Sequence, residues 1–79
     1  MALVIYTKPG CPSCDMARKY YTDSGVPFTE YDAQNDLARR EEMLDASGGD
    51  LTTPCIVLNG EHVQSGWGSP LRGCTVIPD

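Results

Sequence analysis

The sequence LVIYTKPGCPSC at residues 3–14 carries the strongest structural signal in the chain, because an apolar run ends in a turn and leads to two cysteines. Residues 3–7 are aliphatic, β-branched and aromatic, which is typical of a buried strand. Residues 12–24 then follow a helical pattern that ends at a glycine. The sequence therefore places Cys11 at the start of a helix and Cys14 one turn further on.

This position favours the thiolate of Cys11. Unpaired backbone N–H groups and the positive end of the helix dipole meet at a helix N-terminus, and Lys8 can bring a cation to the same place. In such surroundings a cysteine pKa falls from about 8.5 to roughly 3.5–7.5. We expect Cys11 to be the exposed nucleophile and the more shielded Cys14 to be the resolving cysteine. Pro12 suits the first helical turn, where its missing N–H would be unpaired in any case.

Length and composition narrow the possible functions. The chain has 79 residues, a net charge of −5 and no cluster of Lys or Arg, which disfavours a nucleic acid or an anionic membrane as partner. It shows no signal peptide and no apolar run of roughly 18 residues. We expect a single domain over residues 1–79 that acts as a monomer in the cytoplasm.

The rest of the chain alternates strand and helix signals. Residues 26–32 predict a second strand, parallel to the first because a helix connects them. A second helix is expected to run to about Ser47, and Asn59-Gly60 indicates a hairpin between strands at 55–58 and 61–64. No helical segment follows Trp67, because Pro70, Gly73 and Pro78 interrupt the tail, which is expected to be a short turn or irregular.

Several side chains have a structural interpretation that competes with a functional one. The apolar stripe of the first helix is expected to face the core, and the charged run of the second helix is expected to face solvent, although one of its arginines could meet a substrate carboxylate. Cys55 is expected to be a small buried hydrophobe, Cys74 an incidental thiol in the tail and His62 a surface residue. An alternative is a zinc site with four cysteine ligands. The stripe comprises Met16, Ala17, Tyr20 and Tyr21, the charged run Arg39, Arg40, Glu41 and Glu42, and the zinc ligands would be Cys11, Cys14, Cys55 and Cys74.

The Cys-Pro-Ser-Cys motif, the preceding Lys8 and the pair Thr53-Pro54 together resemble the glutaredoxin family of thiol–disulfide oxidoreductases. The resemblance implies an α/β thioredoxin-like fold with a four-stranded mixed sheet in β-α-β-α-β-β order, whose last helix is short or absent here. It also implies that the Thr53–Pro54 bond is cis and faces the two cysteines. Thr53 would then offer its backbone N–H and C=O to an extended peptide such as glutathione.

The glycine-rich stretch after residue 63 modifies this resemblance. Gly66 matches one glycine of the pair that contacts glutathione in glutaredoxins, but the aspartate that follows in the family is absent and Trp67 stands near its place. The segment Ser65-Gly66-Trp67 is similar to one in the glutaredoxin-like redoxins that serve ribonucleotide reductase and are reduced by thioredoxin reductase. The resemblance thus implies a substrate site made of Lys8, Thr53, Pro54, Gly66 and Trp67, with glutathione or thioredoxin reductase as electron donor.

Three classes of function follow. The leading one is a dithiol oxidoreductase for cell redox homeostasis and electron transport, which has no bound cofactor and reduces disulfide-containing proteins or glutathione mixed disulfides through Cys11 and Cys14. The second is a module that binds an iron–sulfur cluster or zinc through cysteines. The third is a redox-inert adaptor that keeps the fold in order to dock a partner.

Overall fold

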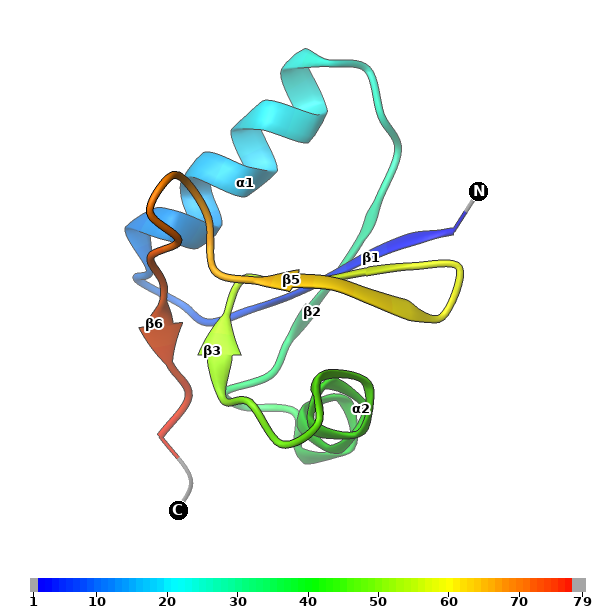
Figure 1. The fold of residues 1–79 in the computed structure, drawn as a ribbon, viewed down its shortest axis with the longest axis vertical. Coiled ribbons are helices and arrows are strands. Elements are labelled where there is room, and N and C mark those ends of the chain that lie inside the picture. The colour runs from blue at the N-terminus through cyan, green and yellow to red at the C-terminus, as the bar shows by residue number, and fades with distance from the viewer. Residues whose placement is uncertain (1, 78–79) are drawn as a thin grey trace.

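The main sheet of the molecule is mixed and has four strands in the order β2-β1-β4-β5 (Figure 1). A computed structural model of the protein describes residues 2–77. Strand β1 (Leu3–Thr7) pairs in parallel with β2 (Thr29–Asp32) and antiparallel with β4 (Cys55–Leu58), which pairs antiparallel with β5 (Glu61–Ser65). The predicted four-stranded mixed sheet, the β-α-β-α-β-β order of its elements along the chain and the parallel pairing of its first two strands are confirmed. The single-domain prediction also includes Met1, Pro78 and Asp79, which lie outside the described residues.

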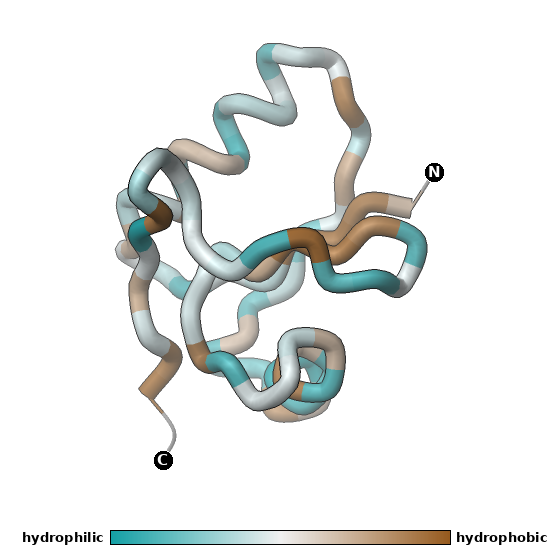
Figure 2. The backbone as a smooth tube through the Cα atoms, in the orientation of Figure 1, coloured by the Kyte–Doolittle hydropathy of each residue, from teal (hydrophilic) through white to brown (hydrophobic). Residues whose placement is uncertain are grey.

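The two helices cover opposite faces of this sheet, α1 (Pro12–Asp23) on one side and α2 (Leu37–Ser47) on the other (Figure 1). Successive side chains of a strand point to opposite faces, so β1 contributes to two separate apolar clusters. The α1 face contains Leu3, Ile5 and Ile56, with Tyr21, Val26, Phe28, Leu58 and Trp67 packed against them. The α2 face contains Tyr6, Ala33, Met43, Cys55, Val57 and Val76. Figure 2 shows hydrophobic segments along the strands in the middle of the molecule.

The first helix differs from the prediction in what it buries. Ala17 is fully buried and Tyr21 packs against the α1-face cluster, as expected of a core stripe. Met16 and Tyr20 are 55% and 56% exposed, so the prediction that they face the core is wrong. The predicted stripe is wider than the face of α1 that contacts the sheet. Only the side of the stripe with Ala17 and Tyr21 lies against the buried cluster of three residues.

The second strand begins later than predicted. It comprises only Thr29–Asp32, and Val26 and Phe28 pack against the α1-face cluster as part of the loop before it. Strand β2 lies at an edge of the sheet, where a short strand limits unwanted pairing with other chains.

The second helix carries a buried arginine. Asp36 caps its start by accepting a hydrogen bond from the Arg39 N–H, and Gly48 ends it in the left-handed conformation. Arg40 is only 7% exposed and donates from Nε to the Ala33 carbonyl at 2.9 Å and from Nη2 to the Gln34 carbonyl. The prediction that the whole charged run faces solvent is therefore wrong for Arg40. Its guanidinium satisfies carbonyls of the loop that precedes α2.

The tail forms a strand that the sequence did not indicate. The predicted hairpin turn at Asn59-Gly60 is confirmed, with both residues at positive φ. Beyond it, β6 (Cys74–Thr75) pairs antiparallel with β3 (Thr52–Thr53) in a separate two-stranded sheet. Val76 follows and is fully buried among the α2-face residues. The tail is therefore a docked extended segment, which corrects the prediction of an irregular end.

Membrane insertion through a helix finds no support in residues 2–77, where neither helix is long and apolar enough to cross a bilayer.

Candidate active site

Cys11 stands at the N-terminal cap of α1, as the sequence predicted. Its backbone is extended, with φ −96° and ψ 113°, and its carbonyl accepts a hydrogen bond from the Asp15 N–H at 3.1 Å. Gly10 has a φ of 74°, a left-handed conformation that favours glycine, and it turns the chain from β1 into α1. Pro12 occupies the first helical position. Strand, turn and helix thus present Cys11 where backbone N–H groups lack helical partners.

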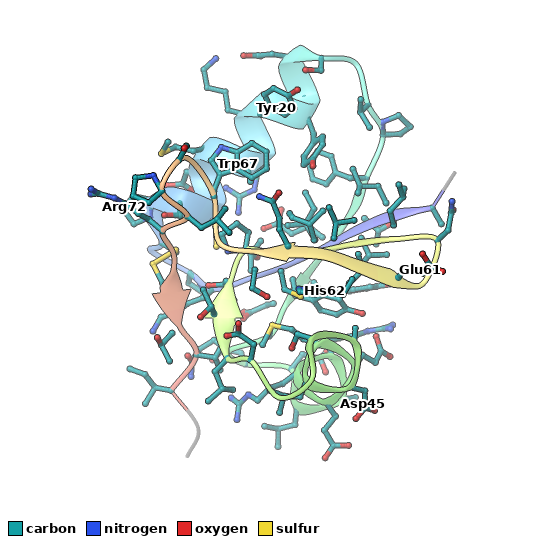
Figure 3. All side chains as sticks on the ribbon, in the orientation of Figure 1. Tyr20, Asp45, Glu61, His62, Trp67 and Arg72 are labelled. Carbon is teal, nitrogen blue, oxygen red and sulfur yellow. A yellow bond between two sulfur atoms is a disulfide. The ribbon has the colours of Figure 1, made fainter. Side chains whose placement is uncertain are left out.

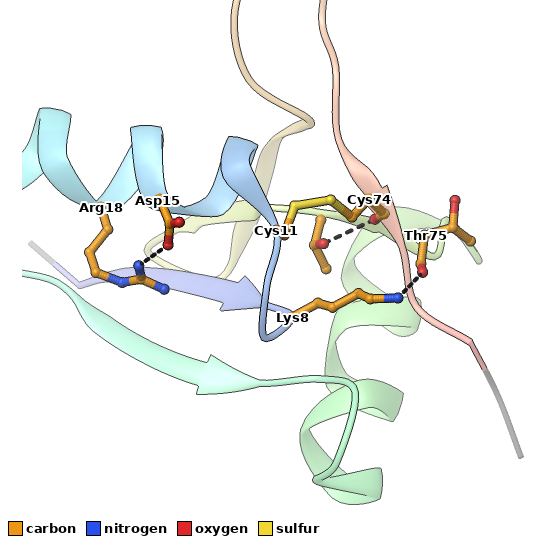
Figure 4. Close-up of a disulfide and its surroundings, with 7 residues drawn as sticks. Lys8, Cys11, Asp15, Arg18, Cys74 and Thr75 are labelled. Carbon is orange, nitrogen blue, oxygen red and sulfur yellow. Dashed lines mark hydrogen bonds and ion pairs between the residues drawn. A yellow bond between two sulfur atoms is a disulfide. The ribbon is translucent and has the colours of Figure 1, made fainter.

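The sulfur of Cys11 is bonded to Cys74 of the tail (Figure 4). The Cα atoms of the two residues are 5.9 Å apart and lie 63 residues apart in sequence. In this disulfide Cys11 is only 1% exposed, so the expectation of an exposed sulfur is wrong for this redox state. The expectation that Cys74 is incidental is also wrong, because β6 brings it directly to the helix start. Cys11 is thus buried in the state in which the tail is bonded to it.

The two remaining cysteines are free thiols with no exposed surface. Cys14 lies in the first turn of α1, and its shielding agrees with the prediction. Cys55 begins β4 and packs among the α2-face residues, as predicted for a small buried hydrophobe. Burial raises the pKa of the Cys55 thiol, which disfavours its reactive thiolate.

Four of the five predicted substrate-binding residues surround the tail. The Thr53–Pro54 bond is cis, as predicted, and Thr53 pairs with Cys74, the residue bonded to Cys11. The Gly66 N–H donates to the Pro54 carbonyl at 2.8 Å, which fixes the glycine-rich loop against this bond. Lys8 donates from Nζ to the Thr75 carbonyl at 3.0 Å (Figure 4). Lys8, Thr53, Pro54 and Gly66 are therefore brought together around Cys11 and the tail.

Trp67 lies to one side of this group, against α1. Its ring lies beside that of Tyr20 (Figure 3), with 5.3 Å between the centroids. The ring centroid of Tyr21 is 5.6 Å from that of Trp67. Backbone hydrogen bonds in both directions join Trp67 to Arg72, at 2.7 and 2.9 Å, and close the loop between them. Trp67 borders hollows on the α1 side of the site, together with Ser13, Met16 and Leu71. Trp67 therefore lies apart from the group around Lys8 and the tail.

A carboxylate that the sequence did not single out connects α1 to the sheet. Glu30 of β2 accepts from Arg18 Nε at 2.8 Å, from Arg18 Nη2, and from the Thr7 hydroxyl at 2.7 Å. Arg18 also pairs with Asp15 at 2.7 Å, in the first turn of α1. The Arg18 guanidinium holds the pKa of the Glu30 carboxyl below its usual range, and the Thr7 hydroxyl acts in the same direction. This network fixes the helix that carries both motif cysteines.

The residues described show no arrangement suited to a metal. Residues 2–77 contain no group of three or more Cys, His, Asp or Glu side chains positioned to hold an ion. Two ligands of the proposed zinc site, Cys11 and Cys74, are bonded to each other. His62 is exposed on β5, where its Nε2 lies 2.9 Å from the Ser65 hydroxyl, in agreement with its prediction as a surface residue.

The sequence indicated no place for Gly73 at the site, and it offered Cys74 there only as a zinc ligand. A Cβ atom on Gly73 would overlap the Thr53 carbonyl oxygen and the Thr52 side chain, so glycine alone permits this close approach. The available signal was a glycine directly before a cysteine in a tail with no helical pattern. A two-residue strand has too short a pattern to reveal its pairing.

Comparison with known proteins agrees with this geometry. The glutaredoxin family model matches residues 3–63. Glutaredoxin 3 of Escherichia coli (strain K12) is 39% identical over 59 residues, which are 75% of this chain and 70% of that protein. Glutaredoxin-C6 of Oryza sativa subsp. japonica is 30% identical over 63 residues, which are 77% of this chain and 56% of that protein. The crystal structure of the thioredoxin-like protein BC3987 aligns with a TM-score of 0.75 at 29% identity, covering 86% of this chain and 90% of that one.

The fold is therefore that of a thioredoxin-like protein. Within that class the chain belongs to the glutaredoxin family, and this membership supports thiol–disulfide oxidoreductase chemistry. The family match includes Lys8, both motif cysteines and Thr53-Pro54, whereas Gly66, Trp67 and Cys74 lie beyond it.

Proposed function

We propose that this protein reduces disulfides through a Cys11–Cys14 dithiol. The Cys11 thiolate attacks a substrate disulfide, forms a mixed disulfide and releases one substrate thiolate; Cys14 then attacks Cys11 and releases the other. Two protein thiols are oxidised and the substrate disulfide is reduced, with two electrons transferred. The observation that carries the proposal is the cap position of Cys11 on α1, where its sulfur already forms a disulfide beside Thr53.

Local electrostatics support a reactive thiolate at Cys11 after reduction. The first N–H groups of α1 and the helix dipole favour a negative sulfur at this position. Asp15 in the first turn would oppose this effect, but its carboxylate pairs with Arg18 at 2.7 Å. Cys55 does not compete, because burial raises the pKa of its thiol.

The proposed substrate site is the edge of Thr53. An extended peptide can pair with the backbone there, as β6 does, while Lys8 and the loop at Gly66 flank the pair and Trp67 extends the surface along α1. The family aspartate that would pair with the glutathione amine is absent. Its loss should cost about 1.5–3 kcal/mol, the scale of a charge-assisted hydrogen bond. We expect glutathione to bind roughly tenfold to hundredfold more weakly than with that carboxylate present.

Weak glutathione binding leaves two candidates for the physiological reductant. Glutathione remains one electron donor, and thioredoxin reductase is the other, as in the redoxins that Ser65-Gly66-Trp67 resembles. A coupled assay should compare glutathione plus glutathione reductase with thioredoxin reductase on the same disulfide-containing protein. We expect turnover with both, and the faster donor identifies the reductant.

The chemistry is tested by substitution at Cys11. Cys11→Ser should abolish disulfide reduction with either donor, whereas the matched control Ser13→Ala, between the two cysteines, should retain it. Alkylation of the fully reduced protein at mildly acidic pH should modify Cys11 first. Turnover by Cys11→Ser, or faster labelling of Cys14 or Cys55, would contradict the proposal.

The proposal also includes the domain organisation, oligomeric state and cellular compartment of the protein. We expect residues 1–79 to act as one domain and as a monomer, in the cytoplasm, where reducing systems keep cysteines as thiols between turnovers. Size-exclusion chromatography of the reduced protein with light scattering tests the oligomeric part.

A further inference from the structure

The dithiol mechanism leaves Cys74 without a role, yet this residue holds the sulfur of Cys11. Cys74 lies beyond the part of the chain that the family model matches, so nothing in that match accounts for it. The hydrogen bonds and packing of the tail explain why Cys74 lies next to Cys11.

Hydrogen bonds at Cys74 and at the two residues after it hold Cys74 in place independently of the disulfide. The Thr53 hydroxyl donates to the Cys74 carbonyl at 3.0 Å, and Lys8 donates to the next carbonyl, that of Thr75, at 3.0 Å. Val76 is fully buried, and its N–H donates to the Leu51 carbonyl at 2.8 Å. The tail is thus anchored by hydrogen bonds at Cys74, Thr75 and Val76.

Contacts further along the tail add to this anchoring. Gln34 exchanges two hydrogen bonds with the backbone of Ile77, at 2.7 and 2.8 Å. On the other side, the paired hydrogen bonds between Trp67 and Arg72 direct the chain back toward β3. Gly73 then passes so close to Thr53 that a side chain would not fit. A thiol held in this way next to Cys11 has a high effective concentration for exchange.

The docked tail also has the form of a substrate. It is extended, it pairs with Thr53, and its cysteine sulfur is bonded to Cys11, which is how a peptide disulfide would sit after attack by Cys11. The same edge of Thr53 can pair with only one strand at a time. A substrate must therefore displace the tail, and the tail must regain this edge before Cys74 can attack Cys11 and release the substrate.

We propose that Cys74 is a second resolving cysteine, which releases substrates from Cys11 and leaves the Cys11–Cys74 disulfide. The inference rests on the proposed function, because it requires a mixed disulfide at Cys11. The Cys74 thiol loses its proton to solvent and attacks the Cys11 sulfur, the bond from Cys11 to the substrate breaks, and the substrate leaves as a thiolate that takes up a proton. The substrate disulfide is the oxidant, and two equivalents of a thiol such as glutathione return the protein to its reduced state.

Exposure supports this role for Cys74. Cys14 has no exposed surface, whereas Cys74 is partly exposed even in the disulfide. A thiol on a tail that leaves and returns can reach a mixed disulfide that protrudes from the site. The resulting state also caps Cys11, which is 1% exposed, so that a second disulfide cannot react until the tail is reduced.

The test adds one probe, oxidised glutathione, to the reduced protein and follows the Cys11–glutathione adduct, from which glutathione is released as a thiol, by quenched mass spectrometry. The Cys14→Ser variant keeps Cys11 and Cys74, and the Cys14→Ser/Cys74→Ser variant keeps only Cys11 at the site. We expect the glutathione adduct of the single variant to disappear at least about tenfold faster, because Cys74 attacks at high effective concentration, and peptide mapping to show Cys11–Cys74. Equal lifetimes of the adduct would overturn the proposal and leave the proposed function intact. Absence of an adduct in both variants would overturn both.

A second pair of variants tests whether tail docking is responsible. In the Cys14→Ser background, Gly73→Ala keeps every reacting sulfur but places a methyl group against the Thr53 carbonyl, so release of glutathione should slow. Thr75→Ala removes only an exposed side chain of β6 and should release glutathione at the rate of its parent. Release by Gly73→Ala at the parent rate would overturn the proposal, because Cys74 would then need no docked tail.

Discussion

Thr53 and Cys74 face each other across the two-residue ladder between β3 and β6, and the Thr53 hydroxyl donates a 3.0 Å hydrogen bond to the Cys74 carbonyl. This contact links the residue before the cis proline to the residue bonded to Cys11. Thr53 has no exposed surface, so its hydroxyl has little access to water. The proposed substrate edge and the docking site of the tail are therefore one surface.

Replacing Thr53 by valine should weaken the docking of the tail. Valine keeps the shape and the backbone pairing but removes the donor to Cys74, at a cost of about 1 kcal/mol for one hydrogen bond. We expect the equilibrium constant for Cys11–Cys74 formation in glutathione buffers to fall roughly fivefold. Thr75→Val, on the exposed side of the ladder, is the control and should leave this constant unchanged. Equal constants for Thr53→Val and the unaltered protein would show that the hydroxyl does not hold the tail.

The Cys11–Cys74 disulfide should stabilise the fold by restricting the unfolded chain. For residues 63 apart in sequence, the chain-entropy model gives about 4 kcal/mol. In a domain of this size, 1 kcal/mol shifts Tm by roughly 4–8 °C, so the oxidised protein should melt at least about 15 °C above the reduced protein. In Cys74→Ser the two conditions should give nearly the same Tm. A large redox-dependent shift in that variant would assign the stabilisation to another cysteine pair.

The sequence was sufficient for those parts of the fold that have a local pattern. The β-branched run of β1, the glycine that ends α1 and the Asn59-Gly60 turn each carry their own signal, and the structure agrees with them. The short ladder of β3 and β6 has no periodicity, because each strand contains two residues. Its pairing depends on contact between segments about 20 residues apart, which no local pattern encodes.

The site shows the same division. The turn into α1 placed Cys11 correctly at its cap, and the family resemblance correctly predicted the cis bond before Pro54. The partner of Cys11 could not be predicted, because the four cysteines allow several pairings and the choice depends on the path of the tail. Arg40 was also missed within its charged run, although it lies three positions before the buried Met43 and so shares a helix face with it.

Arg40 should contribute far more to stability than its neighbour Arg39. Arg40→Met keeps an apolar stem but removes both donors and leaves the carbonyls of Ala33 and Gln34 without them. Hydrogen bonds to a charged group contribute about 1.5–3 kcal/mol, so urea unfolding should show a loss of about that size. Arg39→Met is the matched control, because Arg39 lies next in sequence and forms a surface ion pair with Glu42. Its loss should be clearly smaller than that of Arg40→Met, because exposed ion pairs contribute little to stability. Similar losses for the two variants would contradict the role of the buried guanidinium.

Glu30 should make the stability of the α1 attachment depend on pH. Arg18 and Thr7 lower the pKa of this carboxyl in the folded protein from a usual value of 4.5. A carboxyl with a lowered folded pKa stabilises the fold fully above its unfolded pKa, and this contribution is lost as the pH falls through the folded value. Because the Arg18 and Glu30 side chains are 38% and 31% exposed, solvent screening limits the effect of Glu30→Gln at pH 7 to about 0.5–1 kcal/mol.

Urea unfolding should show this loss at neutral pH and a shrinking difference from the unaltered protein below about pH 4.5, as the Glu30 carboxyl of the unaltered protein becomes protonated. Glu41→Gln, at an exposed position of α2, should change stability little at either pH. A Glu30→Gln loss that persists undiminished in acid would mean that the loss does not come from the negative charge of Glu30.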